Sequence, residues 1–391
     1  MTASPFDSVG LDRDRPAIPL SGSRVEGGLK PKRVLFFGKR KSRTKCTGAL
    51  VDALEQEGLH VISVNCSLLR RWIGSWGMHT VVRLIKKWYR PDLCFVFFHD
   101  LPPLLMEQFS ALIPTVVWME EQTPNTDSSH VDYVRNVRLL CLSTPTLVRA
   151  YQSQGVRNAT FLMSGFSPRY HRPLGKSLPK ARDVAFIGGP GAMGDRPGFL
   201  AWLSQRHDVT LFGRKDSWLP YLARFPQLQW ASEARPKTYA RICATSSIVL
   251  GLNQSHDAAL YFSNRIFLTL ACQGFHITHY VPRMEEIFDR GVHLDWFESR
   301  EECIDKVDWY LGRPRECKKI AEQGARLVHS GHRYQDRVRE ILAILAKEKP
   351  LVCPVDEIEA HENPFEDTVL ETVNQLSPIR RLRRASGGYR D

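Results

Sequence analysis

The sequence lacks the marks of disulfide-rich, zinc-stapled and membrane-spanning proteins. Its 9 cysteines are scattered and no two form a Cys-x-x-Cys pair, so we expect neither a disulfide framework nor a structural zinc site. The first 30 residues contain no apolar run of the secretory type, and no later window approaches membrane-spanning length. We therefore expect a cytoplasmic protein that folds without disulfide bonds or a structural metal ion.

Acidic residues are in the minority. Lys and Arg together number 54 against 42 Asp and Glu, a formal net charge of +12, and the excess gathers at 30–45 and 380–384. Such clusters attract nucleic acid, anionic lipid or polyphosphate without selecting one of them. A solvated tail is a sufficient account of the second cluster, and we do not expect nucleic acid to be the partner.

The pattern of apolar runs predicts two α/β domains. A chain of 391 residues, 43% of them hydrophobic, is long enough for two cores. Short apolar runs alternate with helical patterns, which is typical of parallel sheets covered on both faces. The expected strands cover 34–37, 61–64, 93–98, 115–118 and 139–142 in a first series, and 184–187, 209–212, 248–252 and 276–279 in a second.

Composition predicts the domain boundaries. Residues 1–31, rich in Pro, Gly and Ser, should form a disordered leader, and residues 350–391 a disordered basic tail. A link at 173–180 that carries Pro and Lys separates an N-terminal domain over 32–174 from a C-terminal domain over 183–347. If both are doubly wound, the binding loops at the carboxyl ends of their strands face a shared cleft.

Residues 263–274 carry the most informative pattern. Apolar side chains recur at helical spacing and Gly274 can end the helix, which puts Ser263, Asn264 and Arg265 at its start. Unpaired N–H groups at a helix start and a neighbouring guanidinium both favour phosphate as the ligand. An ordinary capped helix with a surface arginine has the same local pattern.

A glycine-rich loop directly follows the strand expected at 184–187. Residues 188–194 include a Gly-x-Gly-x-x-Gly spacing that starts at Gly189. We interpret Gly188 and Gly189 as a loop that lets a diphosphate approach backbone N–H groups, with Arg196 supplying charge. A plain turn has the same composition.

An NADP site is the third interpretation of this loop. Arg214 and Lys215 end the next strand, where such a site needs a cation for the 2′-phosphate. Pro197 and Gly198, however, should delay the start of the following helix. We therefore rank an NADP-dependent oxidoreductase behind a phosphate loop and behind a plain turn.

Polar side chains follow two strands of the first series. His99 ends the strand at 93–98, and Glu120 and Glu121 follow the strand at 115–118. An imidazole or carboxylate at this edge can act as a general base or orient an acceptor hydroxyl. Adjacent residues in extended chain point opposite ways, so at most one glutamate should face a ligand. A histidine that only caps its loop is an equal alternative.

The second series has similar candidates. Asn253 follows the strand at 248–252, where its amide can bond phosphate or sugar. Glu285 and Glu286 follow the strand at 276–279 and should open a short helix, where a carboxylate can accept ribose or sugar hydroxyls. Glutamates are also common at helix starts because of the helix dipole alone.

Residues 70–89 combine basic, aromatic and apolar side chains. This composition suits a patch that rests on a membrane surface or on an acceptor polymer. A helix that packs its apolar face on the sheet has the same composition.

Several of these passages together resemble one family. Residues 183–189 read Asp-Val-Ala-Phe-Ile-Gly-Gly, and residues 263–274 contain Ser-x-Arg-x-Phe followed by Ala-Cys-Gln-Gly. With Arg196, they resemble the CgeB-like, spore-maturation-type branch of the GT-B glycosyltransferases, over about residues 33–345. The resemblance implies two Rossmann-like domains facing a central cleft. It also implies a nucleoside-diphosphate sugar held by the C-terminal domain, with neither cofactor nor metal.

One residue departs from that family. Its members usually have Glu directly after the Phe of the 263–274 helix, where it is expected to bind ribose, and this chain has Leu268. Loss of a bidentate hydroxyl acceptor weakens donor binding by about 1 to 3 kcal/mol unless Glu285 or Glu286 replaces it.

We therefore hypothesise a glycosyltransferase that moves a sugar from a nucleoside-diphosphate donor to an unidentified glycan, protein or lipid-linked acceptor. Arg196 and Arg265 would neutralise the departing diphosphate. His99, Glu120 and Glu121 are the candidates for catalysis on the acceptor side. The alternative is a non-catalytic binding or scaffold protein of the same fold, supported by the leucine that replaces Glu.

Overall fold

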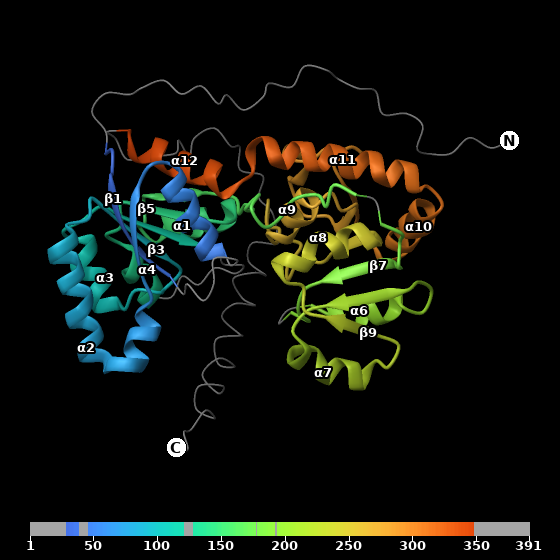
Figure 1. Ribbon diagram of the computed structural model, residues 1–391, viewed down its shortest axis with the longest axis horizontal. Helices are drawn as coiled ribbons and strands as arrows, with labels where there is room; N and C mark the ends of the chain where they lie inside the picture. Colours follow the sequence, from blue (N-terminus) through green and yellow to red (C-terminus); the bar gives the residue numbers. More distant parts are fainter. Residues whose placement is uncertain (1–28, 39–45, 121–127, 177, 192–193, 348–391) are drawn as a thin grey trace.

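Two domains, each built on a six-stranded sheet with parallel neighbours, stand side by side (Figure 1). The computed structural model describes residues 29–38, 46–120, 128–176, 178–191 and 194–347. The predicted tail and nearly all of the predicted leader lie outside these ranges. The two sheets confirm the predicted doubly wound α/β class.

The first sheet has the strand order β2-β1-β3-β4-β5-β6. Its strands are β1 (Arg33–Phe37), β2 (His60–Val64), β3 (Leu93–Phe97), β4 (Thr115–Met119), β5 (Leu139–Leu142) and β6 (Ala159–Phe161). Its helices are α1 (Cys46–Gln56), α2 (Cys66–Tyr89), α3 (Pro103–Ser110), α4 (Ser128–Val134) and α5 (Pro145–Ser153). The predicted strands are confirmed. The short edge strand β6 is an addition, because three residues carry too little pattern to stand out.

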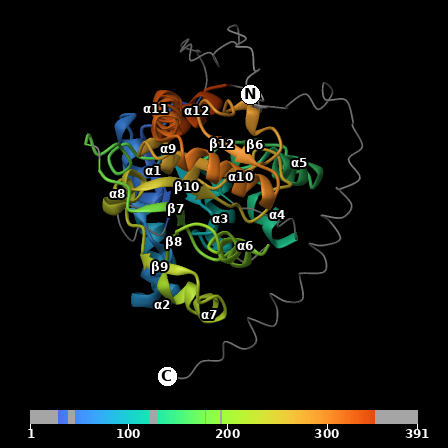
Figure 2. The same cartoon turned by 90° about the vertical axis from the view of Figure 1, so that its right-hand side faces the viewer.

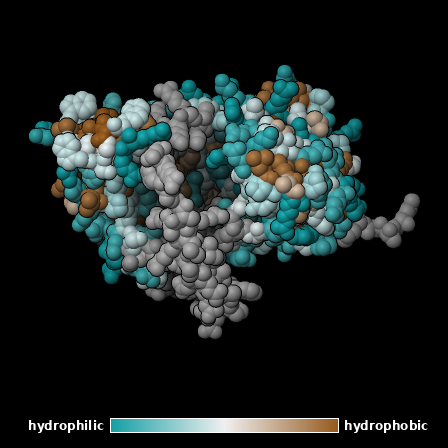
Figure 3. Space-filling view, turned by 90° about the horizontal axis from the view of Figure 1, so that it is seen from below, coloured by the Kyte–Doolittle hydropathy of each residue, from teal (hydrophilic) through white to brown (hydrophobic). Residues whose placement is uncertain are grey.

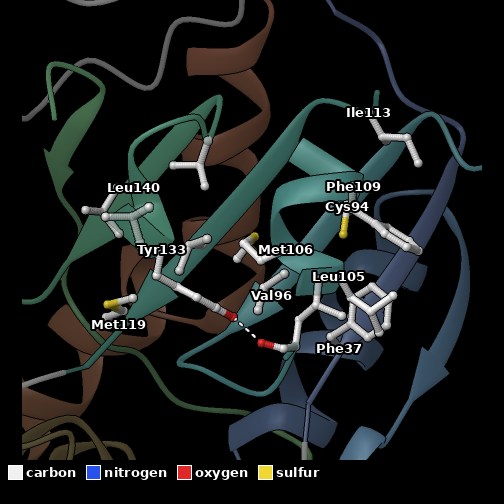
Figure 4. Close-up of a cluster of buried hydrophobic side chains, with 14 of the residues drawn as sticks. Phe37, Cys94, Val96, Leu105, Met106, Phe109, Ile113, Met119, Tyr133 and Leu140 are labelled. Atoms are coloured by element: carbon white, nitrogen blue, oxygen red, sulfur yellow. Dashed lines mark hydrogen bonds between the residues drawn. The ribbon is translucent and has the colours of Figure 1, made fainter. Parts of the chain in front are cut away.

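Alternate residues of these strands pack against helices on opposite faces. Val34 packs in one buried cluster with α1, whereas Leu35 packs in another with α2 and α3. Figure 4 shows the second cluster, where the Tyr133 hydroxyl donates a hydrogen bond to the Leu101 carbonyl at 2.7 Å. Burial on both faces explains why the strands are continuous apolar runs.

The second sheet has the order β12-β11-β10-β7-β8-β9. Its strands are β7 (Arg182–Ile187), β8 (Val209–Phe212), β9 (Gln229–Ser232), β10 (Ser246–Gly251), β11 (His276–His279) and β12 (Asp295–Phe297). The helices are α6 (Arg196–Leu203), α7 (Lys215–Arg224), α8 (Pro236–Thr245), α9 (Arg265–Ala271), α10 (Arg300–Leu311), α11 (Pro314–Gly331) and α12 (Tyr334–Leu345). The predicted strands are again confirmed, and the edge strands β9 and β12 are additions.

Helix α6 corrects one prediction. Pro197 and Gly198 do not delay its start, since the helix begins at Arg196 and contains both. The Asp195 carboxylate accepts a hydrogen bond from the Gly198 N–H at 3.0 Å, which caps the first turn. Proline is tolerated in a first turn because its missing N–H has no partner there in any case.

The ends of two other helical segments also differ from expectation. Helix α9 ends at Ala271, and the left-handed residue after it is Gln273 (φ 58°) rather than Gly274. Gly274 is needed for packing, because a Cβ there would lie 3.0 Å from the Cβ of Cys243. The expected helix at Glu285 is a single 3-10 turn, Met284–Glu286.

The two domains are joined by a crossing of chain segments. Phe166, in the link between the sheets, donates its N–H to the His332 carbonyl at 3.3 Å and accepts the Tyr334 N–H at 2.9 Å. Gly165 lies against this crossing, and a Cβ there would approach the His332 carbonyl oxygen to 3.0 Å. The link and the returning chain are therefore in backbone contact.

Helix α12 belongs to the first domain by its packing. Val338, Ile341 and Leu345 are buried in the cluster that contains α1. Figures 1 and 2 show α11 and α12 in sequence along one edge of the molecule, with α12 over the first sheet and α11 over the second. The chain thus returns to the first domain after His332, which differs from the predicted C-terminal domain of 183–347.

Two expected absences concern only the part of the chain that the structure describes. None of the described helices combines the length and apolarity needed to cross a bilayer. The 8 cysteines of that part are free thiols.

Several buried histidines are held neutral. Burial lowers the pKa of His171 and His276 to about 4. Burial, with the nearby Arg337 cation, lowers that of His332 to about 3. An unfolded chain protonates such imidazoles near pH 6.5. Between about pH 6.5 and pH 4 the unfolded state therefore binds more protons than the folded state.

We predict that Gly165→Ala destabilises the protein by about 1 to 3 kcal/mol, because the added methyl group must displace backbone at the crossing. Gly331→Ala is the matched control, since a Cβ at that helical glycine meets nothing within 4 Å. Thermal or urea unfolding of both variants measures the difference. Equal stability of the two variants would contradict this prediction, because it would show that the backbone at the crossing can move apart to admit a methyl group at little cost.

We predict that the free energy of unfolding falls as the pH is lowered from about 6.5 to 4, by up to about 1.4 kcal/mol per pH unit for each buried histidine. His276→Gln should flatten this dependence because it removes one of these imidazoles. His60→Gln, at an exposed position, should leave it unchanged. Thermal melts across the pH range test this, and an unchanged slope in His276→Gln would contradict it.

Candidate functional site

Both sheets have a switch point, where the chain leaves neighbouring strands toward opposite sides of the sheet. It lies between β1 and β3 in the first sheet and between β7 and β10 in the second. His99 follows β3, Gly188 follows β7 and Asn253 lies two residues after β10. Ligands of doubly wound folds bind in the crevice at such points. Figure 3 shows the molecular surface hollowed between the two domains.

Two arginines meet the glycine loop at the second switch point. Arg265, the first residue of α9, donates from Nη1 to the Ile187 carbonyl at 2.8 Å and from Nε to the Ser263 hydroxyl at 2.9 Å. Arg196, the first residue of α6, donates from Nη1 to the Gly189 carbonyl at 2.8 Å. Arg265 is thus held by the last residue of β7, and Arg196 by the loop that follows it.

The charge of this arginine pair is not balanced within the described residues. Arg196 is only 5% exposed, and its Nε and Nη2 are buried without a hydrogen-bond partner there. Burial and the neighbouring Arg265 lower the pKa of Arg196 to about 10. No carboxylate of the described ranges forms an ion pair with either arginine. A buried cation without a counter-charge is costly, so the site is suited to an anionic ligand.

The glycines make room for these guanidiniums. A Cβ at Gly188 would lie 1.7 Å from Nη1 of Arg265, and one at Gly191 would lie 3.0 Å from Nη1 of Arg196. Gly191 also has a φ of +81°, which residues other than glycine rarely adopt. Glycine is therefore favoured at these two positions of the loop because a larger residue would collide with Arg265 or Arg196.

Asn253 closes the other side of the switch point. Its Oδ1 accepts a hydrogen bond from the Ser263 N–H at 2.9 Å, whereas its Nδ2 is buried and has no partner among the described residues. Asn253, Ser263 and Arg265 line one small cavity together with His276. The Asn253 amide thus offers a free donor next to the guanidiniums.

A histidine pair lies beside the arginine pair and was absent from our sequence interpretation. The rings of His256 and His279 stack at 3.7 Å with 9° between their planes. His256 accepts the Asn253 N–H at its Nε2 (3.2 Å), so this nitrogen is unprotonated. Burial, His279 and Arg196 lower the pKa of His256 to about 3. In the sequence, His279 stands at the end of the strand predicted at 276–279, and we interpreted it as part of that strand.

The two glutamate candidates of the second domain form their hydrogen bonds with residues other than Arg196 and Arg265. Glu286 accepts from Nη2 of Arg283 at 3.0 Å, and Glu285 accepts the Tyr280 hydroxyl at 3.2 Å. Asn264 is the N-cap residue of α9, but its side chain makes no capping hydrogen bond.

Leu268 lies one turn after Arg265 on α9. Residues three apart on a helix share a face. The side chain is half-buried and packs against two buried clusters of the second domain. It therefore fills apolar space one turn after Arg265 on the same helix.

The first domain presents His99 and Glu120 in different surroundings. His99 is exposed, and its ring lies 4.6 Å from that of His130 and 4.9 Å from that of Tyr133. The preceding residue, Phe98, has a left-handed backbone (φ 54°), an unfavourable conformation of the kind found at functional sites.

Glu120 is half-buried near the domain crossing. Its carboxylate accepts the Ser164 hydroxyl at 2.6 Å and lies 3.9 Å from the Cys46 sulfur. Burial raises the pKa of the Glu120 carboxyl, and burial together with this carboxylate raises that of the Cys46 thiol. Glu121 lies outside the described residues.

Comparisons with known proteins agree on the fold. The family model described as "Glycosyl transferase-like" matches residues 196–343. The Anabaena protein Alr3699/HepE, solved in complex with UDP and glucose, is similar with a TM-score of 0.57 at 13% identity, covering 80% of this chain and 99% of that one. Sucrose-phosphate synthase from Thermosynechococcus elongatus is similar with a TM-score of 0.59 at 10% identity, covering 80% and 98%.

A glycosyltransferase from Rickettsia africae is similar with a TM-score of 0.57 at 12% identity, covering 81% of this chain and 99% of that one. No curated protein matches the sequence. At such low identities the solved structures speak for the fold alone. The chain therefore has the GT-B fold, and residues 196–343 match the glycosyl transferase-like family.

Proposed function

We propose that this protein is a cytoplasmic glycosyltransferase that takes a sugar from a nucleoside-diphosphate donor and belongs to the CgeB-like branch. The observation that carries the proposal is the pair of buried Arg196 and half-buried Arg265, with which no described carboxylate forms an ion pair. A diphosphate matches this pair in charge and in its capacity to accept several hydrogen bonds. The match to the glycosyl transferase-like family and the neighbour solved with UDP-glucose support the same ligand class.

The arginine pair would act most strongly on the leaving group. When the bond between the sugar and the diphosphate breaks, negative charge grows on the departing oxygen. Arg265 is already held by the Ile187 carbonyl and Ser263, so it need not reorganise as this charge develops. Arg196 and Asn253 offer donors that have no described partner. Arg196 and Arg265 would stabilise the charge on the departing diphosphate, and we propose that no metal or cofactor takes part.

The acceptor would bind to the first domain. His99 is our first candidate for the general base because its side chain is exposed at the switch point of that sheet. Glu120 is the second, because its carboxylate already accepts the Ser164 hydroxyl and is half-buried. Closure of the two domains would exclude water from the transfer step.

One observation favours a second candidate function. Leu268, one turn after Arg265, packs against apolar clusters at the position where the resembling family is expected to have a ribose-binding glutamate. A protein that holds a nucleotide or a glycan without transferring sugar would not need that carboxylate. Release of nucleoside diphosphate by the wild-type chain in the presence of candidate acceptors would reject this alternative.

We predict that Arg265→Ala lowers the affinity for nucleoside diphosphates by about tenfold to a hundredfold, as loss of a charged hydrogen-bonding group does. A panel of nucleoside diphosphates and nucleotide sugars, including UDP-glucose, is measured by thermal shift and by calorimetry. Without ligand, the variant should melt close to the wild type.

Arg214→Ala is the control for that experiment. Arg214 is an exposed cation of the same domain, and it would bind the 2′-phosphate if the site held NADP. Unchanged nucleotide-sugar binding in this variant is expected. If Arg265→Ala melts far below the wild type without ligand and binds normally, the arginine is structural and the proposed site is wrong.

We further predict that Leu268→Glu tightens binding of nucleoside diphosphates by about fivefold to a hundredfold, because it restores an acceptor for two hydroxyls. Leu268→Gln has a similar size without the charge and should recover less. Calorimetry with UDP and with 2′,3′-dideoxy-UDP separates ribose contacts from phosphate contacts. An effect of equal size on both ligands would contradict a ribose contact at this position.

A further inference from the structure

Helix α2 exposes large apolar side chains on the outside of the first domain. Trp76 is 83% exposed, Leu84 58% and Trp88 78%. At 3.6 residues per turn these three positions fall within an arc of roughly 120° on the exposed side of the helix. Trp72, which lies before the kink at Gly74, is also 73% exposed. Three exposed tryptophans on one helix exceed what scattered surface residues explain.

The same helix is entirely basic in its charged residues. Its sequence contains Arg70, Arg71, Arg83, Lys86 and Lys87 and no Asp or Glu. The buried face, with Met78 and Val82, packs on the first sheet. The predicted packing of 70–89 on the sheet therefore holds for one face of α2, and the exposed face needs another explanation.

Helix α3 extends this surface. An open groove of about 770 Å³ runs between α2 and α3, which lie side by side in Figure 1. Leu112, at the rim of this groove, is 70% exposed, and Leu104 on α3 is 64% exposed. Asp92, the one acidic residue among the groove residues, is paired with Arg33 at 3.2 Å.

We propose that the exposed face of α2, with the rim of α3, docks the protein on an anionic lipid membrane. Tryptophan prefers the boundary between headgroups and acyl chains, where its ring is apolar and its N–H remains hydrated. The cations of α2 attract anionic headgroups, each by about 1 kcal/mol near the surface. A helix with apolar and basic exposed side chains that lies in the interface plane is the known form of such anchors.

The composition of this face argues against a second copy of the chain and against a nucleic acid as the partner. A second copy of the chain would bring the cations of one α2 against those of the other, which is repulsive. A nucleic acid could stack on the tryptophans, but it gains little from the exposed Leu84, Leu104 and Leu112, which a bilayer would bury. The proposal does not depend on sugar transfer.

Co-sedimentation of the full chain with vesicles tests the proposal. Vesicles of phosphatidylcholine alone are compared with vesicles that contain about one-third phosphatidylglycerol, at low and high salt. We expect binding to the anionic vesicles, reduced by salt, and little binding to the neutral ones. Equal binding to both kinds of vesicle, or to neither, would overturn the proposal.

Variants assign the binding to α2. The double variant Trp76→Ser and Trp88→Ser should lower the partition to anionic vesicles about tenfold or more, because two large apolar side chains no longer insert. The double variant Arg71→Gln and Lys87→Gln should lower it roughly fivefold per charge. Leu219→Ser is the matched control, since Leu219 is a 50% exposed apolar residue on α7 of the second domain.

Three outcomes would reject the proposed surface. Wild-type binding by both double variants would move the contact to the other basic clusters of the sequence. A dimer in solution that the tryptophan variant dissociates would identify the face as a contact between copies. Binding of single-stranded RNA that competes with vesicles and is lost in both variants would identify a nucleic-acid surface.

Discussion

The crossing of the chain at Phe166 is the constraint on which the arrangement of the two domains depends. Its peptide group bonds to His332 and to Tyr334, so the link out of the first sheet and the return from the second are held together. The return continues into α12, which packs with α1, and Thr144 adds a hydrogen bond to the Ala259 carbonyl at 2.7 Å. The two domains are thus connected by backbone and core contacts, rather than by a single covalent link.

Parallel pairing then determines where a ligand can bind. All carboxyl ends of a parallel sheet lie at one edge, and a doubly wound sheet opens a crevice at its switch point. At the second switch point the loop after β7 and the start of α9 bring Arg196 and Arg265 together. Folding places two like charges in a region of low exposure, which costs stability, and an anionic ligand would recover it. Apolar contacts alone would not select this arrangement.

Much of the fold could be predicted from local pattern. A buried parallel strand must be apolar along its whole length, so the runs at β1, β3 and β4 are visible in the sequence. The edge strands β6, β9 and β12 have only three or four residues each, and so short a pattern does not separate them from loops. The start of α6 was mispredicted because the Asp195 cap and the tolerance of a first turn for proline outweigh the breaker residues.

The sequence by itself determined the α/β class, the positions of the long strands and the presence of arginines near glycine-rich turns, because these follow from neighbours along the chain. Only the tertiary structure decided that Arg196 and Arg265 meet at the carboxyl end of β7 and lack carboxylate partners among the described residues. It also decided that His256 stacks on His279 and that α12 packs on the first domain. These contacts join residues far apart in sequence, and local propensity carries no information about which distant segments will pack together.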